Sequence, residues 1–144
     1  MASASRRFFQ RLRLWHGGPM ALLIGTALVA AGLLQTTTAT QTLGCPTGTV
    51  LIAKFDFGHN RYEFDKPDGN ENVVRITNGS AHGGDWQSTM PVAAIVVKGG
   101  PAAVVTWFDP PQTTGEFSGG NLPPVGAGNT PDISNVQFCG QDST

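Results

Sequence analysis

Apolar and polar residues alternate in short runs along most of the chain after residue 45. Residues 49–57 read T-V-L-I-A-K-F-D-F, where alternate positions are apolar: Leu51, Ala53, Phe55 and Phe57. A period of two is typical of a β-strand with one side buried, so this run predicts a strand. A polar turn, G-H-N, follows it.

A second pair of runs predicts a hairpin. Residues 61–65 (R-Y-E-F-D) and 71–77 (E-N-V-V-R-I-T) alternate in the same way, with Val74 and Ile76 on one face. The polar stretch between them contains Asp68-Gly69, a favoured turn pair. The acid-rich segment 65–72 also raises the alternative of a calcium loop, but it lacks the Asp-x-Asp-x-Asp-Gly order of an EF-hand, so we expect a plain turn.

Residues 92–97 differ from these runs because they are apolar on both faces. Such a run predicts a central strand that is covered on both sides. The next strand, 102–109, is expected to end at Pro110 and Pro111, which have no N–H for a ladder. A short edge strand is expected at 114–118.

The last predicted strand, 133–139, contains an irregularity. Val136 and Phe138 share a face, and Ile133 joins them only if the strand bulges near Asn135. Six or seven short strands with frequent turns and no amphipathic helix predict an all-β fold, a small antiparallel β-sandwich, with a closed barrel as the alternative.

The first 39 residues have the order of a signal peptide. Four arginines and no acid precede the apolar stretch Ala21–Leu34, which has 14 residues where a membrane span needs roughly 20. Arg6 and Arg7 partly match a twin-arginine export signal, and general secretion is the alternative. We expect a cut after Ala39, leaving residues 40–144 as a secreted domain; an uncleaved membrane anchor is the other interpretation.

Charge is divided between these two parts. From Cys45 onward the chain has five basic and ten acidic residues, a net charge of −5. Nucleic-acid binding depends on Lys and Arg neutralising phosphates, so a nucleic-acid partner is not expected.

The two cysteines, Cys45 and Cys139, allow two interpretations. In an exported chain, two cysteines with no leftover thiol predict one disulfide between the two ends of the domain. The alternative is lipidation of Cys45, since T-L-G-C (42–45) resembles a lipobox. This segment departs from a lipobox at Thr42, where Leu is usual, and it lies ten residues beyond the apolar run.

Three segments together resemble a known kind of module. They read C-P-x-G-T-V-L-I-A-K-F-D-F, D-W-Q-S-T-M-P-V-A-A-I-V-V-K-G-G and P-D-I-S-N-V-Q-F-C-G, and they span nearly the whole predicted mature chain. This succession is similar to a small cysteine-bracketed module of exported and cell-surface proteins of bacteria and archaea. The resemblance implies an extracellular all-β domain with a terminal disulfide, and it implies no catalysis.

Candidate chemistry is sparse, and no enzyme, metal or cofactor is expected. His59 and His82 stand apart from any zinc-ligand spacing and read as turn residues. The carboxylates of Asp56, Glu63 and Asp65 fall on neighbouring predicted strands, where a paired glycosidase site is conceivable, but alternation favours a solvated face.

The tryptophans suggest one binding site. Trp86 and Trp107, if exposed on one face, would form stacking platforms for sugar rings, with hydrogen bonds from neighbouring polar side chains: Asp85, Gln87 and Asp109. We therefore carry two functions forward. One is a non-enzymatic structural or adhesion module, secreted or on the cell surface, with an extracellular protein partner. The other is a small secreted carbohydrate-binding protein.

Overall fold

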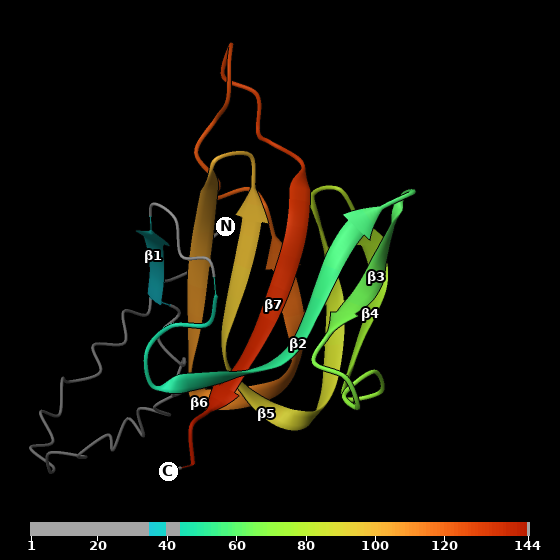
Figure 1. The fold of residues 1–144 in the computed structure, drawn as a ribbon. Coiled ribbons are helices and arrows are strands. Elements are labelled where there is room, and N and C mark those ends of the chain that lie inside the picture. The colour runs from blue at the N-terminus through green and yellow to red at the C-terminus, as the bar shows by residue number, and fades with distance from the viewer. Residues whose placement is uncertain (1–34, 40–43, 144) are drawn as a thin grey trace, which may run out of the picture. The chain divides into compact units, whose positions relative to one another are not determined.

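Two long, bent strands form the centre of the fold. The computed structural model describes residues 35–39 and 44–143. Within them, β5 (Gly83–Gly99) and β6 (Ala102–Ser118) pair antiparallel, with register shifts on both sides of Val92, which lies opposite Gln112. The two strands bend together there (Figure 1). The prediction that a strand ends at Pro110 and Pro111 is wrong, because both prolines lie at the bend, where the ladder is already interrupted.

The other strands line up on the two halves of this pair. The second half of β5 pairs with β7 (Ile133–Gln141), which pairs with β2 (Thr49–Gly58), which pairs with β3 (Arg61–Lys66). The first half of β5 pairs with β4 (Val74–Ser80). The first half of β6 pairs with β1 (Gln35–Ala39).

The result is one antiparallel sheet of order β1-β6-β5-β7-β2-β3, with β4 added on β5. The sheet curls into a half-barrel (Figure 1). The predicted all-β antiparallel class is confirmed, and the half-barrel is compatible with either predicted shape. No helix among the described residues has the length and apolarity that crossing a membrane requires.

The hairpin predicted for 61–77 is wrong, because β3 pairs with β2 instead of β4. The β2–β3 turn consists of His59 and Asn60, whose φ angles are 52° and 63°. Two positive φ angles are typical of the type I′ turn that fits the twist of a hairpin. The predicted turn at Asp68-Gly69 is present, but it carries the chain across to β4, and Asn70 Nδ2 anchors it by donating to Ile52 O at 2.8 Å.

The inner face of the curled sheet carries the main core. Trp86, Phe138, Ile52 and Ile95 are its largest fully buried side chains. All residues from 92 to 97 are buried, which confirms the strand predicted to be covered on both faces. On β2 a register shift between Leu51 and Ala53 places Ile52 in the core, where the alternation had placed Leu51.

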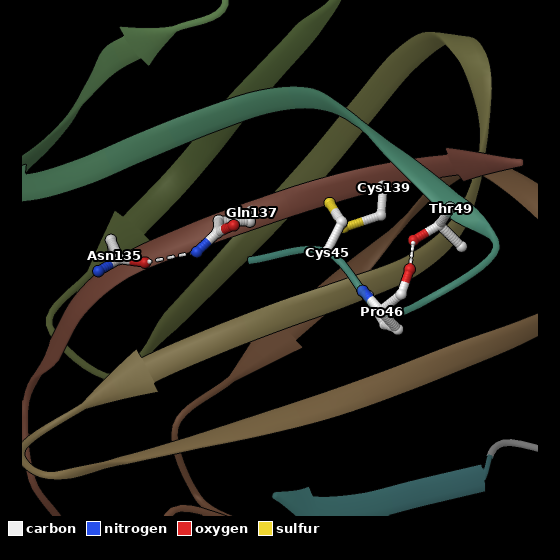
Figure 2. The surroundings of a disulfide bond; sticks show 6 residues. All are labelled: Cys45, Pro46, Thr49, Asn135, Gln137 and Cys139. Carbon is white, nitrogen blue, oxygen red and sulfur yellow. Dashed lines mark hydrogen bonds between the residues drawn. A yellow bond between two sulfur atoms is a disulfide. The ribbon is translucent and has the colours of Figure 1, made fainter. Parts of the chain in front are cut away.

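A second, smaller apolar cluster lies on the outer face of the same sheet. Its buried members come from the central strands: Ala94, Val96, Ala103, Val105 and Cys139. Cys45 packs against it, and its sulfur is bonded to that of Cys139, 94 residues further along the chain (Figure 2). The predicted disulfide is therefore confirmed, and it leaves Cys45 no thiol for the lipid of the alternative interpretation.

The starts of β2 and β7 are each set by local backbone geometry. Pro46 O accepts hydrogen bonds from the Thr49 hydroxyl at 2.7 Å and from Thr49 N at 3.1 Å, which starts β2 (Figure 2). On β7, Lys98 lies opposite Asn135 whereas Gly99 lies opposite Ile133, so Ser134 is the extra residue of a bulge. The bulge predicted near Asn135 is confirmed, and it brings Ile133 into the core with Val136 and Phe138.

The predicted leader is only partly described. Arg6, Arg7 and the apolar stretch lie outside the described residues, so these predictions are unchanged. The last five residues of the predicted leader, 35–39, form β1 on the edge of β6.

Candidate functional site

The two tryptophans predicted as a sugar platform lie in different clusters. Trp86 is only 1% exposed in the main core, where its ring contacts those of Phe108 and Phe138 at centroid distances of 5.8 and 5.5 Å. Trp107 is half-buried in the outer cluster. The sugar platform required Trp86 to be exposed, and this condition is not met, because G-G-D-W is the start of β5 and not a turn. The two rings therefore share no stacking surface.

The polar residues predicted beside them are also dispersed. Asp85 accepts a hydrogen bond from Asn78 Nδ2 at 2.6 Å on the neighbouring strand. Gln87 lines a shallow hollow of about 370 Å³ together with Arg75. Asp109 is exposed at the bend of β6, before the cis bond to Pro110. The structure does not bring Asp85, Gln87 and Asp109 into one site.

The carboxylates considered for glycoside hydrolysis are held in ion pairs. Lys54 Nζ lies 2.8 Å from Asp56 Oδ1 and 2.7 Å from Asp65 Oδ2. The hydrogen bond from Lys54 lowers the pKa of Asp65. For Lys54, partial burial lowers the pKa, but the hydrogen bonds and charges of the two aspartates outweigh it and the pKa is raised. Glu63 pairs with Arg61 at 2.7 Å, so the predicted solvated face is confirmed.

Metal-ligating side chains are scattered over the part of the chain that the structure describes. His59 occupies the β2–β3 turn and His82 the β4–β5 turn, as predicted. His82 Nδ1 lies 3.9 Å from Asp132 Oδ1, and both side chains are largely exposed. Residues 35–39 and 44–143 contain no group of three or more His, Cys, Asp or Glu side chains that could hold a metal ion.

A half-open groove on the concave side of the half-barrel is a candidate site for a small ligand. It has a volume of about 450 Å³, which is in the usual range for small ligands. The bend of β6 creates it, since both halves of that strand contribute to the walls. Its apolar surface comes from β5 and β6: Ile95, Val97, Phe108 and Phe117. Its polar residues are Thr106, Gln112, Glu116, Ser118 and Asn121.

A buried hydrogen-bond donor lies next to one of the groove's lining residues. Trp86 does not itself line the groove, and its buried Nε1 has no hydrogen-bond partner among the described residues. Gly115, which lines the groove, lies opposite Trp86 in the ladder, and a Cβ at position 115 would stand 3.1 Å from Nε1. A buried N–H without a partner is costly, so a native structure usually has a reason for keeping one.

Tyr62 bridges the seam between β3 and β4. Its hydroxyl donates to Ser80 O at 2.8 Å and its ring packs on Phe117 at 5.3 Å, linking β3 to β4 where their backbones do not pair. Burial raises the pKa of Tyr62 to about 12. Side-chain contacts of Tyr62 therefore link β3 to β4, while the bend of β6 leaves the groove half-open.

Sequence reasoning missed the groove, because its residues come from strands whose pairing was not known. One signal was present: Gly115 lies inside a strand, and a glycine there often marks a close approach by another group. No protein-family model matches the chain, and no curated protein or solved structure shows significant similarity to it. The resemblance to cysteine-bracketed surface modules therefore stays a prediction.

Proposed function

We propose that this chain is an exported interaction module, without catalytic activity, that takes an uncharged apolar group carrying a hydrogen-bond acceptor into the groove. The observation that carries the proposal is the buried, unpartnered Trp86 Nε1–H, which lies against Gly115, a lining residue of a groove with an apolar surface. A carbonyl oxygen that enters the groove at Gly115 would reach Nε1 once the indole edge moves toward it, and the hydrogen bond it accepts would remove the cost of the unpartnered donor.

The charge of the groove disfavours an anionic ligand. Glu116 is the one ionisable side chain among the described lining residues, so they offer no cation to pair with an anionic group, and Glu116 itself is exposed to water and needs no cationic partner. The aliphatic and aromatic side chains supply the remaining contact area, as is usual for small-ligand sites.

Three further observations support an exported, non-enzymatic module. Disulfides persist in oxidising compartments outside the cytoplasm, and this chain has one between its two cysteines. Its N-terminal sequence has the order of an export leader. The carboxylates Asp56, Glu63 and Asp65 are paired with Lys54 and Arg61.

Nile red tests this proposal, since it is uncharged, apolar and has a carbonyl acceptor. We expect saturable binding with one site, a blue-shifted emission, and a shift of the Trp86 indole N–H signal in a ¹H–¹⁵N spectrum. Thr106→Phe fills the groove and should weaken binding at least about tenfold, which corresponds to about 1.4 kcal/mol.

Thr77→Phe is the matched control, because Thr77 is an exposed threonine on β4 that does not line the groove. It should bind Nile red as the unmodified protein does. Equal binding by the two variants, or binding that leaves the Trp86 indole signal unmoved, would contradict the groove as the site.

A further inference from the structure

The main sheet ends at β3 on one side and, beneath the short strand β1, at β6 on the other, and the sequences of β3 and β6 differ. β3 carries four charged residues, Arg61, Glu63, Asp65 and Lys66, all of them exposed. Charges of this kind keep an edge strand from pairing with another chain. The first half of β6, residues 102–108, reads A-A-V-V-T-W-F and contains no charge, proline or glycine. Valine, threonine and aromatic residues favour strands, so this edge has no such protection of its own.

β1 is what covers the β6 edge. Its five residues pair antiparallel with residues 103–107, from Gln35 opposite Trp107 to Ala39 opposite Ala103. The register is unbroken over all five pairs. The β6 edge therefore accepts an extended antiparallel strand along this whole length.

The covering strand is also the segment that the predicted cleavage removes. A cut after Ala39 would release β1 with the leader and leave five residues, 40–44, before Cys45. Fully extended, five residues span at most about 17 Å. Cys45 is bonded to Cys139 on β7, and β5 and β6 lie between β7 and the position of β1.

From β7 to the position of β1 there are three strand spacings, which amount to about 14 Å. A five-residue tail of at most about 17 Å uses most of its length to cross them, so about one residue is left to pair with β6. The mature chain is thus too short to replace β1 with its own N-terminus.

We infer that the freed β6 edge pairs antiparallel with β6 of a second copy of this chain. The inference rests on cleavage after Ala39 and is independent of the ligand proposed for the groove. A two-fold pairing centred on Val105 places Val105 opposite Val105 of the second copy. Ala103 then lies opposite Trp107 of the second copy, and Val104 lies opposite Thr106, so a small residue faces a large one on the outer face.

Repulsion between two negatively charged domains disfavours contact through their charged surfaces but not through the uncharged β6 edge. From Cys45 onward the chain has a net charge of −5, but residues 102–108 carry none of it, so the pairing sets no like charges opposite each other. A two-fold axis perpendicular to the joined sheet leaves both concave faces on the same side. The dimer would therefore present two grooves in one direction, which raises avidity for a partner with repeated groups.

The test uses the full chain, exported by a bacterial host and recovered after processing. Intact mass establishes whether the protein begins at Thr40, and light scattering gives its mass in solution. We expect twice the monomer mass. A Val105→Cys variant should form a disulfide between residues 105 of two copies under mild oxidation, mapped by mass spectrometry apart from the Cys45–Cys139 bond.

Ala103→Cys is the matched control. In the proposed register the two residues 103 stand four positions apart along the strand, about 13 Å, which is beyond the roughly 7 Å that a disulfide can bridge. Cross-linking of Ala103→Cys equal to that of Val105→Cys overturns the register. A monomeric mass at every concentration, a different protein linked at residue 105, or a processed chain that still contains residues 35–39 overturns the inference.

Discussion

Trp86 on β5 lies directly opposite Gly115 on β6, and the two residues meet on the concave side of the sheet. Because residue 115 has no side chain, the edge of the indole, with its unpartnered Nε1–H, fits against the backbone of the neighbouring strand. This pair joins the main core to the groove, since Trp86 belongs to the first and Gly115 lines the second.

Gly115→Ala should destabilise the fold. The added Cβ would stand 3.1 Å from Nε1 and 3.2 Å from two further indole carbons, and a buried indole has little room to move. Overpacking of this kind typically costs about 1 to 3 kcal/mol. Urea unfolding at neutral pH measures the free energy of unfolding.

Gly58→Ala is the control for this variant. Gly58 ends β2, and a Cβ there meets no atom within 4 Å, so its effect should stay within about 0.5 kcal/mol. If the indole is the obstacle, a Trp86→Phe background should reduce the cost of Gly115→Ala. An equal cost in both backgrounds would assign it to the backbone instead.

Removing the disulfide should lower stability more than any single surface change. The bond closes a loop of 94 residues, for which chain entropy predicts about 4 to 5 kcal/mol. We expect a Cys45→Ala/Cys139→Ala variant to lose most of that amount in urea unfolding and to keep its strand content by circular dichroism. The reduced protein should show a similar loss. A loss below about 1 kcal/mol would mean that the unfolded chain is already compact.

The strand positions were largely predictable, and the pairing was not. Alternation located β2, β3 and β4, and the apolar run 92–97 located the central strand, because burial fixes these patterns residue by residue. Nothing local marks which strands pair. The Asp68-Gly69 turn has good hairpin chemistry, yet it carries the chain from β3 to a β4 that pairs with β5. The two positive-φ residues His59 and Asn60 already join β3 to β2.

The groove was hidden from sequence reasoning for a related reason. Pro110 and Pro111 read as the end of a strand, whereas they mark a bend that folds β6 around the site. The turn-like composition of G-G-D-W left an exposed Trp86 open as an alternative, and the long β5 overrides that local preference by pairing with both β4 and β6. The disulfide was predictable because two cysteines permit only one intramolecular bond.

The β2–β3 turn offers a test of this pairing. Asn60 has a φ of 63°, in the left-handed region that asparagine and glycine tolerate. Asn60→Val should lower the free energy of unfolding by about 1 to 2 kcal/mol, because a β-branched residue is strained there. Asn60→Gly keeps the turn and should be neutral within about 0.5 kcal/mol. Equal effects of the two variants in thermal unfolding would show that this turn does not determine the pairing.

Tyr62 should make stability fall in alkaline solution. Burial raises its pKa from about 10 to about 12, so the folded state favours the neutral phenol. The stability this gives is fully present below pH 10, and it is lost as the pH rises from 10 through 12, because the unfolded chain gives up the proton first. Tyr62 is the single tyrosine of the chain, so absorbance at the phenolate band titrates it alone.

Tyr62→Phe separates this titration from the hydrogen bond to Ser80 O. At pH 8 the variant should be less stable by about 1 kcal/mol, the usual worth of one hydrogen bond. Between pH 10 and 12 the free energy of unfolding should fall more steeply for the unmodified protein than for Tyr62→Phe, so that the difference between them narrows or reverses. Parallel pH profiles, or a phenolate titration near pH 10, would show that the ring does not close the seam between β3 and β4.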